Sequence, residues 1–515
     1  MKNLNLLSVL VVLMLGMMPV PAQEYRNPVI PGYHPDPSVC RVGDTFYLVN
    51  SSFQYFPGVP IFQSKDMVHW QQIGNVLDRE SQLPLKGASS WLGIYAPTIR
   101  YHDGTYYMIT TNVGNGGNFL VTAKDPRGPW SDPVWLKQQG IDPSLYFENG
   151  KCYMVSNPGD AIWLCEINPQ TGEQLTESRK LWQGDGGRYP EGPHIYKKDG
   201  YYYLLISEGG TELAHRLTIA RSKKIEGPYE SNPANPILTN CSRLGQSLQI
   251  QGTGHGDFVQ AADGSWWMVF LAYRNYGGSY HHLGRETYLA PVQWDEGQWP
   301  VVNGGLPIDT LVKANTLPAV VLAKHLGASA DFAPTTGQYE WVYLQNPIMA
   351  NYATPDVKVK RLYPHGILTE NNQPTFLGRR QESACFSLEA SVLPKDDVEA
   401  GLTVYQIHDG HLDLVVSSRE ISLRCKLKSI DYVVKSVPRS AEGYVKLRIH
   451  SNGEMYYFDC SQNGTDYQPL GAVNCSLMST EVAGGFTGVT LGMFAEGKAK
   501  GCGYADFSGF RYSGQ

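Results

Sequence analysis

Three acidic residues, Asp36, Asp142 and Glu191, are the strongest chemical signal in the chain. Each opens a short motif that contains proline: Asp-Pro-Ser at 36–38 and at 142–144, and Glu-Gly-Pro-His at 191–194. Hydrolysis of a glycosidic bond needs one carboxylic acid to protonate the leaving oxygen and one carboxylate to activate water or attack the sugar. The longer Glu191 side chain could reach the leaving group while an Asp acts from the other side. A third carboxylate nearby would raise the pKa of the acid and orient it.

The same motifs also have a purely structural interpretation. Asp-Pro-Ser commonly starts a turn, because Asp accepts backbone N–H bonds and proline fixes the next φ. Two such turns could recur in a repeat, whereas Glu-Gly-Pro-His is harder to explain as a turn alone. His255, between two glycines, could bind water or a metal, but a single histidine without further ligand spacing is a weak metal signal.

A five-fold repeat in the first three hundred residues gives these acids a reason to meet. A turn residue and glycine followed by an aromatic-rich strand recur five times, at intervals of 60, 46, 50 and 64 residues between Tyr47, Tyr107, Tyr153, Tyr203 and Trp267. Four strands of about five residues and their turns fill that length, which is the size of a propeller blade. The sequence therefore predicts an all-β protein with a five-bladed β-propeller over residues 24–318.

One motif precedes the turn glycine of every repeat by 7 to 9 residues, and its first residue is Asp36, Ala96, Asp142, Glu191 or His255. If these motifs open the innermost strands, their first residues meet at one end of the central channel. The register therefore selects Asp36, Asp142, Glu191 and His255 as equivalent residues that face one pocket.

The second half of the chain has a different pattern. Residues 303–335 contain Gly, Pro and Ala without aromatic hairpins, which indicates a linker. Alternating strands return at 384–392, 401–407, 412–416, 444–450 and 454–459, and Asn-Gly or Asp-Gly turns separate several of them. Residues 319–515 are therefore expected to form a linker and a jelly-roll β-sandwich. This half has no clustered carboxylates, so we expect it to be structural or accessory.

The amino terminus has the pattern of a secretory signal peptide, with a basic start, an apolar run from Leu4 to Val20 and a small-residue exit at Ala22. We expect residues 1–23 to be removed, with cleavage near Ala22, and the protein to be exported to the periplasm or the medium without later membrane contact. An uncleaved membrane anchor is the alternative. The formal net charge of -6 provides no basic surface for nucleic acid.

Nine cysteines is an odd number, so at least one thiol is free or pairs between chains. They are scattered, without the spacing of a disulfide scaffold or a zinc site, and most are expected to be buried. Cys460 and Cys475 could form a disulfide, although the sequence does not decide this. No metal ligands are predicted among the site residues.

Several motifs resemble, in order and spacing, those of family 43 glycoside hydrolases: Asn27–Ser38, Ser51–Phe53, Phe56–Gly58, Gly93–Pro97, Asp142–Leu145, Glu191–His194 and Leu283–Thr287. The resemblance continues into the sandwich around 376–404, and the two-domain form is similar to the β-xylosidase and α-L-arabinofuranosidase branch. It implies an exo-acting inverting enzyme, without a required cofactor, that releases terminal α-L-arabinofuranosyl residues from hemicellulose side chains or oligosaccharides. β-D-Xylosidase or dual activity is the alternative. A non-catalytic carbohydrate-binding propeller is the alternative of another class.

The resemblance also implies a role for each polar residue. Asp36 would be the general base that activates water, Glu191 the general acid, and Asp142 the residue that tunes the acid's pKa and orientation. Arg285 resembles the family's substrate-contacting arginine, since its planar donors suit sugar hydroxyls or a carboxylate. A surface salt bridge with Glu286 is the alternative role for Arg285.

The remaining implied site residues would shape the pocket. Phe53 and Tyr95 would form its apolar walls, with Tyr95 standing where the family frequently has Trp. His255 resembles the family's axial histidine, which would help to hold water or a structural calcium ion in the channel. Phe486, from the sandwich, would reach over the pocket as a lid. The substrate implied is an oligosaccharide or polysaccharide, and the oligomeric state is left open.

Overall fold

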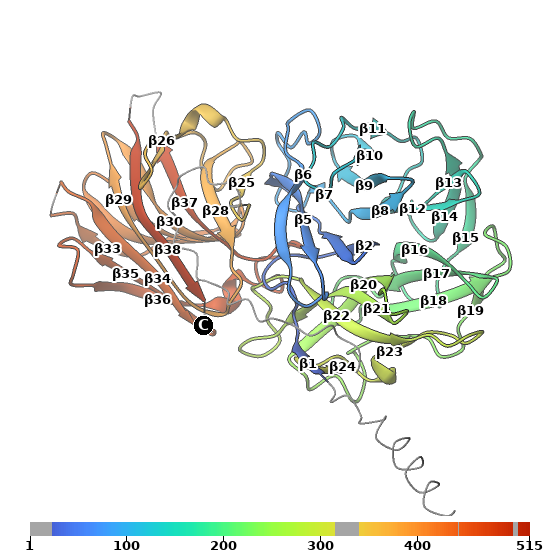
Figure 1. Cartoon of the computed structure of the whole chain (residues 1–515). Helices are drawn as coiled ribbons and strands as arrows, with labels where there is room; N and C mark the ends of the chain where they lie inside the picture. Colours follow the sequence, from blue (N-terminus) through green and yellow to red (C-terminus); the bar gives the residue numbers. More distant parts are fainter. Residues whose placement is uncertain (1–22, 315–338, 441, 498–502, 515) are drawn as a thin grey trace, which may run out of the picture.

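Five antiparallel sheets, one for each sequence repeat, surround a common axis and form the predicted five-bladed β-propeller (Figure 1). A β-sandwich lies beside it, so the all-β, two-domain prediction is confirmed. The protein is described by a computed structural model that covers residues 23–314, 339–440, 442–497 and 503–514. The apolar run and exit of the predicted signal peptide lie outside these residues.

Each blade has four strands in the order of the sequence, and the second blade gains a short fifth strand, β7 (Gly93–Ile94). The innermost strands are β2 (Ser38–Val42), β8 (Thr98–His102), β12 (Ile141–Glu148), β16 (Glu191–Lys198) and β20 (Ile250–Gln260). The second strands are β3 (Thr45–Val49), β9 (Thr105–Val113), β13 (Lys151–Asn157), β17 (Tyr201–Glu208) and β21 (Trp266–Arg274). The third strands are β5 (Gly58–Ser64), β10 (Gly117–Ala123), β14 (Ile162–Ile167), β18 (Arg216–Ser222) and β22 (Glu286–Gln293). The outer strands are β6 (Gln71–Leu77), β11 (Val134–Trp135), β15 (Arg179–Trp182), β19 (Glu230–Ser231) and β23 (Val301–Val302).

Turn chemistry sets the register between the first and second strands of the blades. Asp103, Asn149 and Asp199, and the glycine that follows each, all have positive φ. Positive φ at both central residues is the type I′ turn, whose twist matches that of an antiparallel hairpin. Tyr203, which follows the Asp199–Gly200 turn, is buried and packs against Trp294 and Trp299 of the last blade.

The propeller is closed by its two ends. β1 (Gln23–Arg26) pairs with β24 (Leu311–Ala314), and the Asn27 side chain bonds the backbone of Leu289 in the last blade. Residues 303–314 are therefore propeller structure, a short 3-10 turn η1 (Asn303–Gly305) and β24, and not the linker predicted from Asn303. The rest of that predicted linker up to residue 338 lies outside the described residues.

The sandwich has two antiparallel sheets. The strands of the first sheet, in order across it, are β26 (Tyr352–Asp356), β27 (Val359–Leu362), β38 (Ala505–Gly514), β29 (Cys385–Pro394), β34 (Val445–Asn452), β35 (Met455–Ser461) and β36 (Gln468–Asn474). The second has β28 (Thr375–Arg380), β37 (Thr490–Gly497), β30 (Val398–Ile407), β31 (Gly410–Val416), β32 (Glu420–Leu427) and β33 (Ile430–Pro438). Two 3-10 turns, η2 (Met349–Asn351) and η3 (Cys475–Met478), complete the domain. An apolar core fills the space between the sheets.

All eight cysteines in the described part of the chain are free, including Cys460 and Cys475. The disulfide considered for that pair is therefore not formed. Cys475 instead contacts the Ser451 hydroxyl at 3.6 Å. Most of these thiols are buried among apolar side chains, where burial raises the pKa of Cys475 to about 12.

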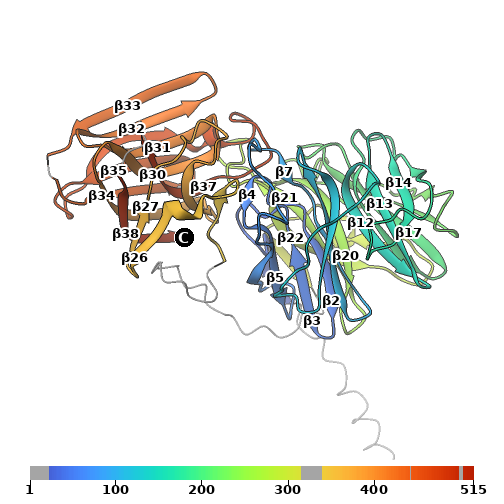
Figure 2. The same ribbon diagram turned by 90° about the horizontal axis from the view of Figure 1, so that it is seen from above.

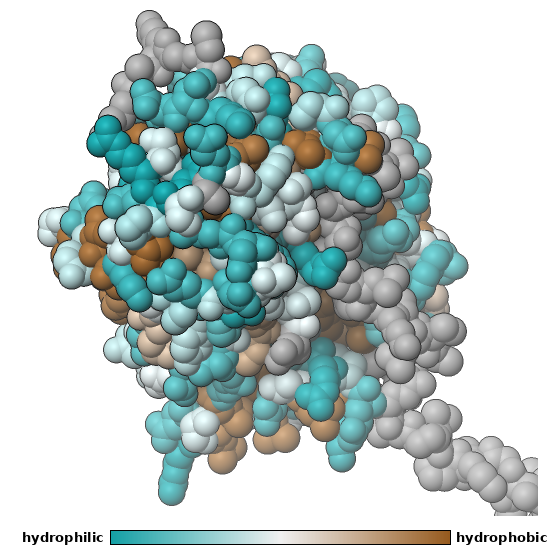
Figure 3. All heavy atoms as spheres, turned by 90° about the vertical axis from the view of Figure 1, so that its left-hand side faces the viewer, coloured by the Kyte–Doolittle hydropathy of each residue, from teal (hydrophilic) through white to brown (hydrophobic). Residues whose placement is uncertain are grey.

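The two domains lie side by side (Figure 2). Backbone pairing and an aromatic cluster join them. β4 (Tyr55–Phe56) of the propeller pairs with β25 (Tyr343–Leu344), which leads into the sandwich. Tyr33 and Phe53 of the propeller pack in one buried cluster with Phe376 and Phe494 of the sandwich. On the sandwich face turned away from the propeller, hydrophobic side chains are scattered among hydrophilic ones (Figure 3). Among the described residues, no helix has the length and apolar character needed to cross a bilayer.

Glu496, on β37, is a carboxyl group that the fold holds away from water. The Leu368 N–H donates to its Oε1 at 2.7 Å. Burial raises the pKa of Glu496 to about 7, and the nearby Asp413 carboxylate adds to this effect, although His411 and Arg424 act in the opposite direction. The folded state therefore binds a proton at this site more tightly than the unfolded chain does.

Replacement of Glu496 by Gln should make stability less sensitive to pH. The parent loses stability as pH rises from the ordinary glutamate pKa of 4.5 to about 7, because the folded state has to ionise a buried carboxyl group. At about 1.4 kcal/mol per pKa unit, the variant should gain up to ~3 kcal/mol over the parent by pH 8 and nothing at pH 4. Calorimetric unfolding of both proteins across this range measures the difference. Glu454→Gln, at an exposed site of the same domain, is the control, and an equal gain in both variants would contradict the expectation.

Candidate active site

A cavity of about 830 Å³ lies at the end of the propeller axis where the innermost strands begin. All eight residues predicted for the site line it: Asp36, Phe53, Tyr95, Asp142, Glu191, His255, Arg285 and Phe486. Seven come from the propeller and Phe486 comes from the sandwich. The fold thus brings together side chains that are up to 450 residues apart in the sequence.

The backbone at the start of the innermost strands aims these side chains into the cavity. Asp36, Asp142 and His255 all have left-handed φ values, 53°, 55° and 46°. Gly192, with φ 58°, takes the equivalent place in its blade, because like the two aspartates it directly precedes the proline of its motif. Glu191 therefore stands one residue before the place in the repeat that Asp36 and Asp142 occupy, although the sequence predicted the same place for all three. A Cβ atom on Gly192 would lie 3.1 Å from the His255 ring, a tight contact that favours glycine at this left-handed φ, and the acidic residue stands one residue earlier.

Asp36 is held by two donors. The Ser51 hydroxyl donates to Oδ2, and Arg285 Nη1 donates to Oδ1 at 2.8 Å. Asp36 and Arg285 are only 4% and 5% exposed, so this ion pair is shielded from water. Arg285 also donates to Thr211 Oγ1 at 3.1 Å and to the Phe486 carbonyl at 3.3 Å. The alternative pairing of Arg285 with Glu286 does not occur, because Glu286 bonds Arg274.

Asp142 lacks such a cation. Its Oδ2 accepts the Gly192 N–H at 3.1 Å, and Nδ1 of His255 is 3.9 Å away. Burial raises the pKa of Asp142 well above its ordinary value, and the negative charges of Glu191 and Asp36 raise it further. Asp142 therefore keeps a proton at pH values where an exposed aspartate is ionised.

Glu191 has one histidine partner, His215, whose Nε2 lies 3.0 Å from Oε1. Burial acts to raise the pKa of Glu191, but the hydrogen bond from His215 and the electrostatic effect of the His215, His255 and Arg285 side chains outweigh burial and lower the pKa. A proton shared among these acids is therefore favoured on Asp142.

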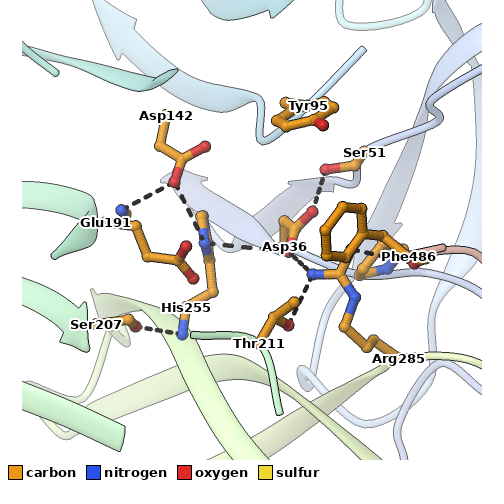
Figure 4. Close-up of polar contacts among 12 residues, drawn as sticks. Asp36, Ser51, Tyr95, Asp142, Glu191, Ser207, Thr211, His255, Arg285 and Phe486 are labelled. Atoms are coloured by element: carbon orange, nitrogen blue, oxygen red, sulfur yellow. Dashed lines mark hydrogen bonds and ion pairs between the residues drawn. The ribbon is translucent and has the colours of Figure 1, made fainter. Parts of the chain in front are cut away.

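His255 lies between Asp36 and Asp142, with the Glu191 carboxyl group facing it (Figure 4). Its backbone N–H donates to Ser207 Oγ at 2.5 Å, which joins the middle of β20 to β17 of the neighbouring blade. Burial lowers the pKa of His255 despite the neighbouring carboxylates, so the ring is neutral at neutral pH. A neutral imidazole can both donate and accept a hydrogen bond at the centre of the three acids.

Aromatic side chains form one wall of the cavity. The Phe53 ring lies 5.0 Å from Tyr95 and 6.4 Å from Phe486 between centroids, and the Arg285 guanidinium is 5.7 Å from the Phe53 centroid. The Tyr95 hydroxyl donates to the Trp91 carbonyl at 2.9 Å, so its ring edge is fixed. Phe486 is 41% exposed and stands at the rim. The wall thus suits the apolar face of a sugar ring.

The sandwich loop 479–489, which carries Phe486, is fastened to the propeller. Glu481 accepts two hydrogen bonds from His281, from the backbone N–H at 3.1 Å and from Nδ1 at 2.5 Å. Gly284 and Gly488 touch so closely that a Cβ on Gly284 would lie 2.6 Å from the Gly488 Cα. The sandwich is therefore part of the site, which its lack of clustered carboxylates did not suggest.

Several residues of the site were not predicted from the sequence. Ser51 and Thr211 bond the Asp36–Arg285 pair, and His215 bonds Glu191. Tyr189 and Glu212 line the cavity mouth. Ser51 lies within a motif of the family resemblance, which could have identified it. The others stand in irregular segments around β17 that no repeat marks.

Two family models match the chain, one over the propeller and one over the sandwich. A model described as glycosyl hydrolases family 43 matches residues 25–300, and one described as the β-xylosidase C-terminal concanavalin A-like domain matches residues 329–513. A non-reducing end α-L-arabinofuranosidase of Bacteroides ovatus is 42% identical, covering 99% of this chain and 99% of the relative. A xylosidase/arabinosidase of Butyrivibrio fibrisolvens is 40% identical, covering 94% and 98%.

Solved structures give the same result. The structure named "Bacteroides ovatus Xyloglucan PUL GH43B" superposes with a TM-score of 0.91 at 41% identity, covering 96% of this chain and 100% of the other. A xylan β-1,4-xylosidase of Bacillus halodurans superposes with a TM-score of 0.89 at 33% identity, covering 95% and 100%. Both the domain order and the fold are therefore shared along almost the whole chain.

Proposed function

The chain belongs to family 43 of the glycosyl hydrolases, and from that membership we propose that it is an exo-acting, inverting α-L-arabinofuranosidase. The observation that carries the proposal is the convergence of Asp36, Asp142 and Glu191 in one cavity, with Arg285 paired to Asp36 alone. This arrangement gives three carboxyl groups three different environments. One fold can therefore supply a base, a proton donor and a charge that tunes the donor.

Asp36 is the general base. Arg285 and Ser51 fix the orientation of its carboxyl group, which accepts a proton from a water molecule that attacks the anomeric carbon. Glu191 donates its proton to the leaving oxygen as the glycosidic bond breaks. The two events occur on opposite faces of the sugar and invert the anomeric configuration.

Asp142 controls the protonation of Glu191, the proton donor. In the empty pocket its pKa is raised and that of Glu191 is lowered. A bound sugar displaces water and presents the glycosidic oxygen as an acceptor, which favours the proton on Glu191. Ionised Asp142 beside it then raises the affinity of Glu191 for that proton, as two neighbouring carboxyl groups do not readily ionise together.

Action at a chain end follows from the walls of the pocket. Phe53, Tyr95 and Phe486 close one side, and the loop with Phe486 is fastened to His281 of the propeller. A wall on this side favours entry of a terminal sugar over passage of a polysaccharide through the pocket. Exo action is supported by this closure.

The choice of sugar rests on relatives. The Bacteroides ovatus relative is described as a non-reducing end α-L-arabinofuranosidase, and it is 42% identical to this chain. β-D-Xylosidase or dual activity is the second candidate, because the Butyrivibrio fibrisolvens relative is described as a xylosidase/arabinosidase. Hemicellulose side chains or oligosaccharides are the proposed substrates.

We propose that the axial channel near His255 holds water and not a calcium ion. Calcium takes six to eight oxygen ligands. Near His255, Asp36 Oδ1 is paired with Arg285 and Asp142 Oδ2 accepts the Gly192 N–H. No group of three metal-ligating side chains occurs in the part of the chain that the structure describes. A water molecule on the neutral His255 ring fits this donor set better than a divalent cation.

A panel of aryl glycosides identifies the sugar. We expect release of arabinose from aryl α-L-arabinofuranoside to be faster than release of xylose from aryl β-D-xylopyranoside, as measured by kcat/KM for each. Activity on the xyloside alone would replace the first candidate with the second. Binding of arabino-oligosaccharides without turnover of any glycoside would instead support a carbohydrate-binding propeller.

Removal of either catalytic carboxyl group should abolish turnover. Glu191→Gln and Asp36→Asn should each lower kcat on oligosaccharide by roughly 10²- to 10⁴-fold, the usual contribution of general acid or base catalysis, while both proteins stay folded by circular dichroism. Glu454→Gln is the matched surface control. NMR of the first-formed product should show the inverted anomer. Near-parental activity in either variant, or a retained anomer, would refute these roles.

Export is proposed from the amino-terminal sequence alone. Its basic start, apolar run and Ala22 exit have the features of a cleaved secretory signal. In a host that secretes it, the mature protein should begin near Gln23, and its retained amino terminus can be sequenced. A mature chain that still begins at Met1 in the membrane fraction would support an uncleaved anchor.

A further inference from the structure

His215 precedes β18 and contacts the proposed acid from outside the layer of residues that the strand register selects. Its ring is fully buried, although the residues just before it, Thr211 and Glu212, line the open cavity. No other hydrogen bond reaches the Glu191 carboxyl group from the described residues. His215 is therefore the polar contact that sets the orientation of that group.

The His215 ring is tightly packed against the backbone of a neighbouring strand. A Cβ atom on Gly254 would lie 2.2 Å from His215 Cε1, so the ring packs directly on the glycine backbone of β20. The His215 backbone N–H donates to the Glu212 carbonyl at 3.0 Å and fixes the backbone that carries the ring. A Cβ on Gly209 would lie 2.1 Å from the Ala214 carbonyl oxygen, which shows how tightly that loop folds. Two glycines thus make room for one histidine.

The hydrogen bonding of the ring identifies its tautomer. Nε2 faces Glu191 Oε1 at 3.0 Å, whereas Nδ1 is buried without a hydrogen-bond partner. A carboxyl oxygen that does not carry the proton can only accept, so Nε2 must donate. A second proton on Nδ1 would be buried with no acceptor, which is costly. The neutral ring with its hydrogen on Nε2 satisfies both constraints.

We propose that His215 is a positioning residue for the general acid, which holds Glu191 Oε1 so that the transferable proton stands on Oε2 and faces the leaving oxygen. This inference rests on the assignment of Glu191 as the acid. When the proton leaves Oε2, the O–H bond breaks and the new carboxylate keeps the Nε2–H hydrogen bond at Oε1. That bond is stronger to a carboxylate than to a neutral acid, so it stabilises the transition state more than the ground state.

Two substitutions of His215 distinguish a role in positioning Glu191 by a hydrogen bond from a role in filling space. In His215→Gln the amide nitrogen can reach the position of Nε2 and donate to Oε1. In His215→Asn it reaches only the position of Nδ1, so the hydrogen bond is lost. His102→Asn is the control, since His102 is another propeller histidine that stacks on Phe147 and does not line the cavity.

The readout is the dependence of kcat on the leaving group. We would measure aryl α-L-arabinofuranosides and aryl β-D-xylopyranosides from 2,4-dinitrophenyl, which leaves without protonation, to phenyl, which needs it. His215→Asn should lose roughly 10²-fold in kcat on the phenyl glycoside, within the range of general acid catalysis. It should change little on the dinitrophenyl glycoside, and His215→Gln should recover most of the loss. A merely structural histidine would lower kcat for all leaving groups alike.

Glu191→Gln, measured in the same series, separates failure of this inference from failure of the acid assignment. A steep leaving-group dependence in Glu191→Gln beside a uniform loss, or no loss, in His215→Asn overturns the positioning role alone. No leaving-group dependence in Glu191→Gln overturns the acid assignment and the positioning role with it. A steep dependence in both, relieved in His215→Gln, supports both.

Discussion

The arrangement of the site depends on one buried ion pair on the propeller axis, between Arg100 and Asp257. Arg100 Nη1 donates to Asp257 at 2.8 Å, and the same carboxylate accepts from Ser38 and from the Tyr196 hydroxyl. These groups come from four of the five blades. A buried charge that loses its partner is strongly destabilising, so the innermost strands cannot shift apart separately. Asp257 stands only two residues beyond His255, and the network therefore fixes the strand starts that carry the site.

Above that network, chemically similar groups acquire different properties through their neighbours. Asp36 and Asp142 have the same side chain, the same left-handed backbone and similar burial. Of the three acids, only Asp36 forms an ion pair with Arg285. Burial raises the pKa of Asp142, and the negative charges of Glu191 and Asp36 raise it further. Glu191 differs again, because a histidine reaches it from a neighbouring loop. Division of labour among the acids thus comes from the placement of one arginine and one histidine.

The sequence predicts those parts of the fold that local chemistry repeats. Asp-Gly or Asn-Gly before four aromatic strands, and Gly43-Asp44 before the first, predicted five blades. The motif before each turn predicted the pocket. The strict equivalence of Glu191 with Asp36 was wrong by one residue, because the close approach of His255 to Gly192 is a tertiary contact. In the sandwich, the strands predicted at 384–392, 401–407, 412–416, 444–450 and 454–459 overlap β29, β30, β31, β34 and β35. The exposed residues of β33 carry no alternation that could mark it.

Tertiary contacts also explain why some site residues were not predicted from the sequence. Phe486 was expected through family resemblance, but the Glu481–His281 contact that fastens its loop joins residues 200 apart and has no local signature. Thr211 and His215 lie in a loop whose shape depends on glycines and on a neighbouring blade. Contacts of this kind are fixed by the assembled fold, whereas a single sequence reports mainly on each strand and turn.

The last strand of the chain has a consequence for when the enzyme can first act. β38 lies inside its sheet, between β27 and β29, so the sandwich cannot be completed until the carboxyl terminus has been synthesised. The propeller, by contrast, has all its strands once residue 314 has emerged. A nascent chain can thus hold Asp36, Asp142 and Glu191 in place while the Phe486 wall of the cavity is still missing. Completion of the cavity therefore depends on synthesis of the sandwich, although all three carboxylates belong to the part of the chain that is made first.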